Sequence, residues 1–326
     1  MRNTLPPLAY TQQLEESLAG NMGVSVEGSN ATVPGDDMWH DLSSNTLTLP
    51  PIDPYGPSRW IDIYSRGNKG FSFEVSPWDS WVHASPSSGS VPASGKGDKR
   101  VYLSIDWNKA PAGSSMATIN VTVSSDDYGN FGQPTIILPV NKTSVPASFH
   151  GFVESDGTVS IEPEHATRNT STADASYAVI PGYGRTLSGV TLLPVLAGTQ
   201  QPPSSPRLEY DMYLFSDVPT AKATVYLGPS LNTDPSRPLT YAIAFNDAEP
   251  QMVQFVPSTP LGTLPSNWDA TVSNAVWTNT TSHSFESGKN TLKLWAVEPG
   301  VVFQKIVVDL GGVRQSYLGP PESMIV

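Results

Sequence analysis

The chain has 326 residues, no cysteine, and 18 basic against 30 acidic residues, which gives a formal net charge of −12. A chain of this length can bury a core without disulfides or metal ions, and it has room for two ordinary domains. The negative charge repels phosphate backbones and anionic membrane surfaces, and the absence of thiols excludes a cysteine nucleophile or thiolate zinc site. We therefore expect no nucleic-acid partner and no membrane partner.

A short helix is predicted near the start of the chain. Apolar residues recur at every fourth position from Tyr10 to Leu18, which places them on one face of a helix. Residues 21–57 contain several Pro and Gly breakers and predict an irregular linker. The first 50 residues are therefore expected to form a helical remnant and a linker.

From about Arg59 onward, apolar and polar residues alternate. This alternation predicts β-strands, because successive side chains of a strand point to opposite faces. At least five short strands fall within fewer than a hundred residues, a density typical of an antiparallel immunoglobulin-like sandwich. We place this domain at residues 51–146. Its strands are expected at 61–63, 71–75, 101–107, 117–123 and 136–138.

A second β-domain is predicted over residues 148–326. Asp156-Gly157 favours the positive φ angles of a tight hairpin turn between two short apolar strands. Long loops at 197–206 and 255–269 suit a jelly roll, whose connections cross between sheets. Later strands are expected at 208–214, 224–227, 241–245, 291–297 and 302–308. The predicted fold class is therefore all-β, an immunoglobulin-like sandwich followed by a jelly-roll sandwich.

Familiar catalytic motifs are absent from the sequence. It contains no Gly-X-Ser-X-Gly elbow, no phosphate-binding loop and no His-Glu-X-X-His, and its five histidines never take paired metal-ligand spacing. Most glycosidases need two carboxyl groups on either side of the scissile bond. The adjacent acids of this chain lie in polar or breaker-rich segments, where solvation is favoured. We assign no catalytic residue and expect no cofactor to be required.

Three acidic residues suggest a structural calcium site. Alternation places Glu162 and Glu164 on the same side of an extended segment. The first and last strands of a jelly roll are commonly neighbours, so Asp309 at the end of the last predicted strand is expected to join them. Calcium prefers such oxygen ligands. The alternative is an exposed acidic strand end, and Pro163 between the glutamates stiffens the segment.

Aromatic residues in predicted loops are candidates for sugar binding, since sugar faces stack on exposed rings. Trp39, Trp268 and Tyr183 lie in such loops, with partial burial as the alternative interpretation. Five Asn-X-Ser/Thr sequences predict glycosylation sites. These are Asn30, Asn120, Asn141, Asn169 and Asn279.

The C-terminal half carries a series of motifs in a fixed order. These are Gly182–Thr186, Pro206–Asp211, Leu292–Trp295, Glu298–Val302 and Gln304–Asp309. A final motif, Ser316 to Ser323, follows Gly311-Gly312. In this order the motifs resemble the C-terminal region of glycoside hydrolase family 115, and the final motif looks like the terminal signature of that family. The preceding sandwich is similar to the family's middle β-domain, and the resemblance implies that the second sandwich is a galactose-binding-like jelly roll.

This resemblance implies a function. Members of the family are inverting α-glucuronidases that remove glucuronic acid, often 4-O-methylated, from xylan, and their catalytic acids belong to a barrel that this chain lacks. The first seven residues look like the junction after that barrel. The resemblance therefore implies the non-catalytic C-terminal portion of a fungal α-glucuronidase, which braces or completes the catalytic domain, contacts glucuronoxylan oligosaccharides and supports a homodimer.

The resemblance also points to particular residues. Tyr183 and Arg185, in a Gly-rich loop, are expected to lend side chains to a neighbouring active site. In related galactose-binding-type modules, an early Glu-X-Glu and a late Asp hold structural calcium, which coincides with Glu162, Glu164 and Asp309.

The full-length enzyme is expected outside the cell, although the chain as written has no signal peptide. The alternatives are a stand-alone carbohydrate-binding protein and a hydrolase that acts by itself.

Overall fold

The computed structural model describes residues 22–29, 32–33, 46–66, 69–92, 97–124 and 133–326. The helix predicted from Tyr10 to Leu18 lies outside these residues. The chain divides into two compact units, residues 1–143 and 144–326, which are described separately. Among the described helices, none is long and apolar enough to cross a membrane.

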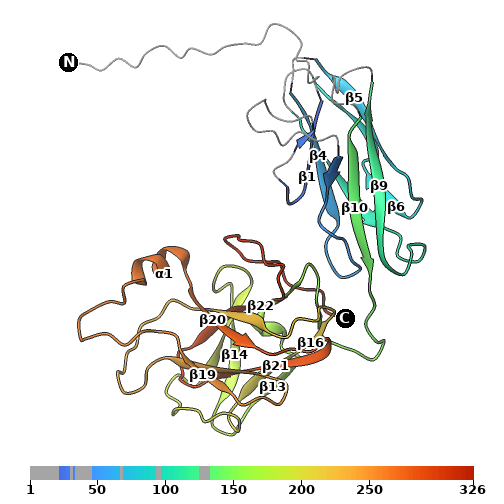
Figure 1. The fold of residues 1–326 in the computed structure, drawn as a ribbon. Helices are drawn as coiled ribbons and strands as arrows, with labels where there is room; N and C mark the ends of the chain where they lie inside the picture. Colours follow the sequence, from blue (N-terminus) through green and yellow to red (C-terminus); the bar gives the residue numbers. More distant parts are fainter. Residues whose placement is uncertain (1–21, 30–31, 34–45, 67–68, 93–96, 125–132) are drawn as a thin grey trace, which may run out of the picture. The chain divides into compact units, whose positions relative to one another are not determined.

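The N-terminal unit is an immunoglobulin-like sandwich of two five-stranded sheets (Figure 1). The first sheet has the order β2-β1-β4-β8-β6 and the second β3-β10-β9-β5-β7. The first contains β1 (Met22–Val26), β2 (Thr32–Val33), β4 (Arg59–Ser65), β6 (Val82–Ser85) and β8 (Lys99–Ile105). The second contains β3 (Thr46–Thr48), β5 (Phe71–Pro77), β7 (Ser88–Val91), β9 (Gly113–Val123) and β10 (Thr135–Lys142). All neighbours are antiparallel except β3 and β10.

The core of this sandwich follows the predicted alternation. In β9, Ala117, Ile119 and Val121 are fully buried, whereas Thr118 and Asn120, which alternate with them, are only half-buried. The prediction of an irregular linker over residues 21–57 is wrong, because β1 pairs with β4 and buries Met22 and Val24 completely. The strands are short, and Gly23 within β1 and the breakers around the strands hide their alternation in the sequence.

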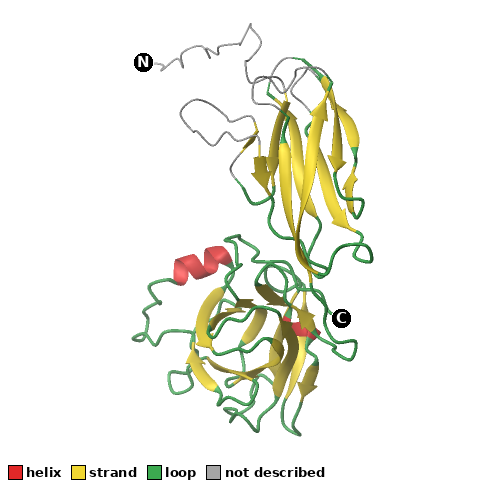
Figure 2. Ribbon diagram, turned by 45° about the vertical axis from the view of Figure 1, so that its right-hand side comes forward, coloured by secondary structure: helices red, strands yellow, loops and turns green. Residues whose placement is uncertain are grey.

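The C-terminal unit is a jelly-roll sandwich of two six-stranded sheets, with little helix (Figure 2). One sheet runs β11-β16-β21-β18-β19, with β13 beside β16; the other runs β14-β15-β22-β17-β20, with β12 beside β22. The first contains β11 (Phe152–Val153), β13 (Arg168–Thr170), β16 (Arg207–Leu214), β18 (Thr240–Phe245), β19 (Gln251–Gln254) and β21 (Gly288–Ala296). The second contains β12 (Thr158–Ile161), β14 (Ser176–Pro181), β15 (Ser188–Leu193), β17 (Ala221–Leu227), β20 (Trp277–His283) and β22 (Val302–Asp309).

The Asp156-Gly157 turn has the expected geometry, with φ of 52° and 63° and a bridge between Ser155 and Thr158. The strands on either side do not form a hairpin, however. β11 pairs with β16 in one sheet, and β12 pairs with β22 in the other. The turn therefore carries the chain from one layer of the sandwich to the other.

The segment after β22, residues 311–326, packs along β12 and β22. Ser323 exchanges hydrogen bonds with Ser160 of β12: its N–H donates to the Ser160 carbonyl (2.9 Å), and its Oγ accepts from the Ser160 N–H (3.0 Å). Near the chain end, Val326 and Gly151 exchange backbone hydrogen bonds of 3.1 Å. This segment, called the C-terminal segment below, covers the outer side of β12 and buries Ser160 fully.

Candidate functional site

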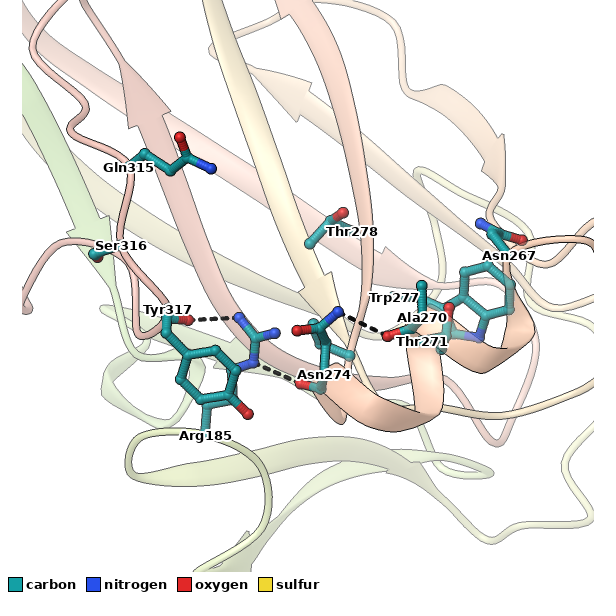
Figure 3. Close-up of a pocket in the computed structure, with 11 residues that line it drawn as sticks. Arg185, Asn267, Ala270, Thr271, Asn274, Trp277, Thr278, Gln315, Ser316 and Tyr317 are labelled. Carbon is teal, nitrogen blue, oxygen red and sulfur yellow. Dashed lines mark hydrogen bonds between the residues drawn. The ribbon is translucent and has the colours of Figure 1, made fainter. Parts of the chain in front are cut away.

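A cavity of about 480 Å³ lies on the C-terminal unit, between three segments far apart in the sequence (Figure 3). The first is the loop between β14 and β15, which supplies Arg185. The second is helix α1 (Trp268–Asn274) with the start of β20, and the third is the C-terminal segment at residues 315–317. We call it the Arg185 cavity. Its polar lining includes Asn267, Asn274, Thr278, Gln315, Ser316 and Tyr317.

The loop that carries Arg185 takes its shape from two glycines. Gly182 and Gly184 have φ of 66° and 92°, a region that side-chain-bearing residues rarely adopt. A Cβ at position 184 would also collide with the side chain of Gln304 on β22. The glycines therefore let the loop lie directly on the sheet and fix the backbone from which Arg185 extends.

The guanidinium of Arg185 is held in place by carbonyls from the other two segments. Its Nε donates to the Asn274 carbonyl (2.7 Å) and its Nη1 to the Tyr317 carbonyl (2.6 Å), as Figure 3 shows. Its central carbon lies 4.2 Å from the centroid of the Tyr317 ring, a cation–π distance. Arg185 is the only charged side chain among the described residues that line the cavity. It therefore places a fixed positive charge there.

A buried ion pair links two of the segments that form the cavity. Glu162 Oε1 lies 3.2 Å from Lys305 Nζ, and both side chains are almost inaccessible. Glu162 Oε2 accepts a hydrogen bond of 2.9 Å from Thr186, the residue after Arg185. Lys305 donates to the carbonyl of Pro320 (3.0 Å) in the C-terminal segment. The pair thus ties the Arg185 loop to the C-terminal segment.

Glu322, in the C-terminal segment, also bonds to Glu162 and to the nearby His165. Its Oε1 accepts from the backbone N–H of Glu162 (3.1 Å) and lies 2.8 Å from Nδ1 of His165. The hydrogen bond to Glu322 raises the pKa of His165, while partial burial opposes this shift. The C-terminal segment is therefore anchored most firmly when His165 is protonated.

The three residues predicted to bind calcium do not fit a calcium site. Ile161, the residue before Glu162, pairs with Ile306, whereas Asp309 pairs with Thr158. The antiparallel register therefore places the backbones of Glu162 and Asp309 four residues apart along the strands, roughly 13 Å. Glu162 is neutralised by Lys305, and Glu164 lies 3.5 Å from His165. Asp309 accepts from the N–H of Gly311 in a local turn. Within the described part of the chain, no group of three His, Asp or Glu residues could hold a metal ion.

The aromatic candidates take different positions. Tyr183 is half-buried and is not among the described residues that line the Arg185 cavity. Its side chain packs against Gly189 and Gly228, where an added Cβ would collide with it, and burial raises its pKa. Trp268 begins α1 and packs on the core with its ring centroid 6.1 Å from that of Trp277, so it is not an exposed platform. Trp39 lies outside the described residues.

The predicted glycosylation sites also differ from one another. Asn169 on β13 is exposed, whereas the Asn279 side chain accepts a hydrogen bond of 3.2 Å from the buried Tyr241. Asn120 and Asn141 are half-buried and accept from Thr135 and Ser114, respectively. Asn169 is therefore the most accessible of the four described sites, and Asn30 lies outside the described residues.

A second charged group lies on the other sheet. Arg168 donates to Glu209 and, through both terminal nitrogens, to Asp211 (2.8 and 2.9 Å). Burial opposes ionisation of Asp211, but hydrogen bonds from Arg168 and Thr291 outweigh it and lower its pKa from 3.8 to about 2. The pKa of Glu209 is also lowered, because its hydrogen bonds with Arg207 and Arg168 outweigh its burial. Both carboxylates therefore stay ionised, which is unsuited to a general acid.

Sequence reasoning identified Arg185 but missed most of the cavity lining. Asn267, Asn274, Thr278 and Gln315 are isolated polar residues in loops or at element ends, with no motif to mark them. Tyr317 belongs to the terminal motif, which indicates the family but gives no hint that its carbonyl holds Arg185.

Comparison with known proteins gives one family match. The model of the glycosyl hydrolase family 115 C-terminal domain matches residues 151–322. No curated protein matches the chain.

Among solved structures, the chain is similar to BtGH115A, a family 115 4-O-methyl-α-glucuronidase with specificity for decorated arabinogalactans. The identity is 12% and the TM-score 0.36, over 52% of this chain and 19% of that one. It is also similar to a family 35 carbohydrate-binding module from Clostridium thermocellum (15% identity, 46% of this chain and 97% of that one, TM-score 0.31). The chain thus spans about a fifth of the length of the glucuronidase.

Proposed function

Because the chain belongs to the glycosyl hydrolase family 115 C-terminal domain family through residues 151–322, we propose that it is the non-catalytic C-terminal portion of an α-glucuronidase. In this proposal it braces the catalytic domain and helps to engage glucuronoxylan outside the cell. The family match is the observation that carries the proposal.

The state of the buried carboxylates supports a non-catalytic role. Inverting glycosidases place two carboxyl groups about 6.5–9.5 Å apart around the scissile bond, one of them protonated. The Arg185 cavity has no carboxylate among its described lining residues. Each buried carboxylate of the C-terminal unit is instead held by basic, hydroxyl or amide groups of the fold. These are Glu154, Glu162, Glu209, Asp211 and Glu298.

A domain exchange tests the bracing role. The C-terminal portion of an active family 115 α-glucuronidase is deleted, and this chain is fused in its place. We expect the deletion to lower the release of glucuronic acid from decorated xylo-oligosaccharides, and the fusion to restore it. The chain alone should release none. Release by the chain alone, or a fusion no better than the deletion, would overturn the proposal.

The alternative function, a stand-alone carbohydrate-binding protein, is favoured by the polar lining of the Arg185 cavity. Affinity electrophoresis of the purified chain in gels with and without glucuronoxylan separates the two functions. Retardation without any effect on the fused enzyme would favour the stand-alone binder.

A further inference from the structure

We propose that the Arg185 cavity is a binding site for a saccharide that bears a carboxylate. Arg185 would pair with the carboxylate, and the surrounding amides and hydroxyls would bind the ring hydroxyls. The inference deepens the proposed function and rests on it for the choice of a saccharide as the ligand. The anionic character of the ligand follows from the cavity itself.

The size of the cavity suits a small ligand. Its volume of about 480 Å³ falls within the range of roughly 300–1,000 Å³ found for small-molecule sites. Trp277 lines the cavity but is almost fully buried, so the accessible lining is mainly polar and includes the exposed side chains of Asn274, Thr278 and Gln315. A few convergent polar groups are typical of sites that orient a ligand.

The charge of the cavity selects an anion. Both hydrogen bonds of Arg185 to the walls go to neutral carbonyls, so they fix the guanidinium without cancelling its charge. Its other terminal nitrogen, Nη2, has no hydrogen-bond partner among the described residues. The chain as a whole carries a net charge of −12, yet no carboxylate is among the described lining residues. A ligand carboxylate would gain a charge-assisted hydrogen bond there.

The polar lining suits ring hydroxyls. Gln315 and Ser316 come from the C-terminal segment, and Thr278 from β20; all three side chains are exposed. Asn274 uses its amide nitrogen to cap the carbonyl of Ala270 (2.8 Å), which fixes the orientation of its side chain. Amide and hydroxyl groups both donate and accept, as sugar hydroxyls require.

The buried pair of Glu162 and Lys305 acts as a positioning element for this site. It holds the Arg185 loop through Thr186 and the C-terminal segment through the Pro320 carbonyl. Two of the segments that form the cavity are thereby tied to the sheet before the ligand arrives, which lowers the ordering cost of binding.

Calorimetric titration of the full chain with D-glucuronate and with D-glucose tests the inference. We expect glucuronate to bind at least tenfold more tightly than glucose, because only glucuronate carries a carboxylate. Arg185→Gln should remove this preference. The matched control is Lys222→Gln, which neutralises an exposed cation on β17 that does not line the cavity and should leave binding unchanged. Circular dichroism would verify that both variants fold.

A second variant keeps the test informative if Arg185→Gln fails to fold. Gln315→Ala alters an exposed lining residue and should weaken binding of both sugars while keeping the preference for glucuronate. Equal binding of the two sugars, or wild-type binding by Arg185→Gln, would overturn the inference. If the chain restores activity in the domain exchange but binds no glucuronate, this inference fails while the proposed function stands.

Discussion

The two units of the chain differ in how many polar and charged side chains they bury. In the described part of the N-terminal unit, Arg59 is the one buried polar or charged side chain, and it pairs with Glu27 at 3.2 Å. In the C-terminal unit, fifteen such side chains are buried. The strands show the reason: β8 and β9 alternate between buried and more exposed residues, whereas β12 and most of β22 are buried on both sides.

This difference shows that a sheet covered on both faces needs hydrogen-bond or ion-pair partners for its polar side chains. A sheet with one solvated face can leave its polar side chains in water. When a loop or terminal segment covers the second face, the polar groups on that face are buried and must find partners. In the C-terminal unit these partners tie the Arg185 loop and the C-terminal segment to the sheet.

The largest effect is expected from Lys305→Met in the C-terminal unit. The substitution leaves the buried carboxylate of Glu162 without its cation, which should lower the free energy of unfolding by about 3–5 kcal/mol. Urea unfolding measures it. Arg100→Gln is the control in the N-terminal unit, because the Arg100–Asp62 pair is much more exposed to solvent and should contribute far less to stability. Equal losses in the two variants would contradict the comparison.

A smaller effect is expected from Asp211→Asn, which tests how the stability of the C-terminal unit depends on pH. The pKa of Asp211 is lowered from 3.8 to about 2, so its contribution is complete above pH 3.8 and is lost as the pH falls toward 2. Asp211→Asn should therefore be less stable than the wild type at pH 7, by at most about 2 kcal/mol after allowance for solvent screening. Urea midpoints between pH 2 and 7 should converge at the acid end. A constant difference across this range would rule out the ionised pair as its cause.

In the N-terminal unit, a change in apolar volume should matter more than a change in charge. Ile119→Val removes one methylene from a fully buried position and should cost about 0.5–1.5 kcal/mol. Thermal unfolding would measure the loss. Thr118→Ser, at the half-buried neighbouring position, is the control for the same strand. A larger loss at position 118 would contradict the assignment of the two faces.

The smallest effect is expected from metal removal. Because Lys305 neutralises Glu162 and the register keeps Asp309 away, chelation of divalent cations should leave Tm unchanged. Differential scanning calorimetry with EDTA, and with added calcium, measures this. A Tm that falls with EDTA and recovers with calcium would restore the original calcium hypothesis.

The sequence predicted the fold best where apolar and polar residues alternate regularly along a strand. The alternation from Ala117 to Val123 gave the strand and its buried face, and Asp156-Gly157 gave the turn. It failed over residues 21–57, where short strands lie between breakers. For these strands, pairing with distant parts of the chain outweighed local preference.

The candidate site likewise has features that the sequence predicted and features that only the structure shows. By itself the sequence determined the β-class, the Gly-rich loop that presents Arg185 and the family motifs, because these depend on local spacing and backbone freedom. Only the tertiary structure decided what Glu162 does. The register of β12 against β22 sets Lys305 beside it and carries Asp309 away, and the C-terminal segment closes over the pair. Register and burial depend on contacts between residues distant along the chain, and no local pattern encodes them.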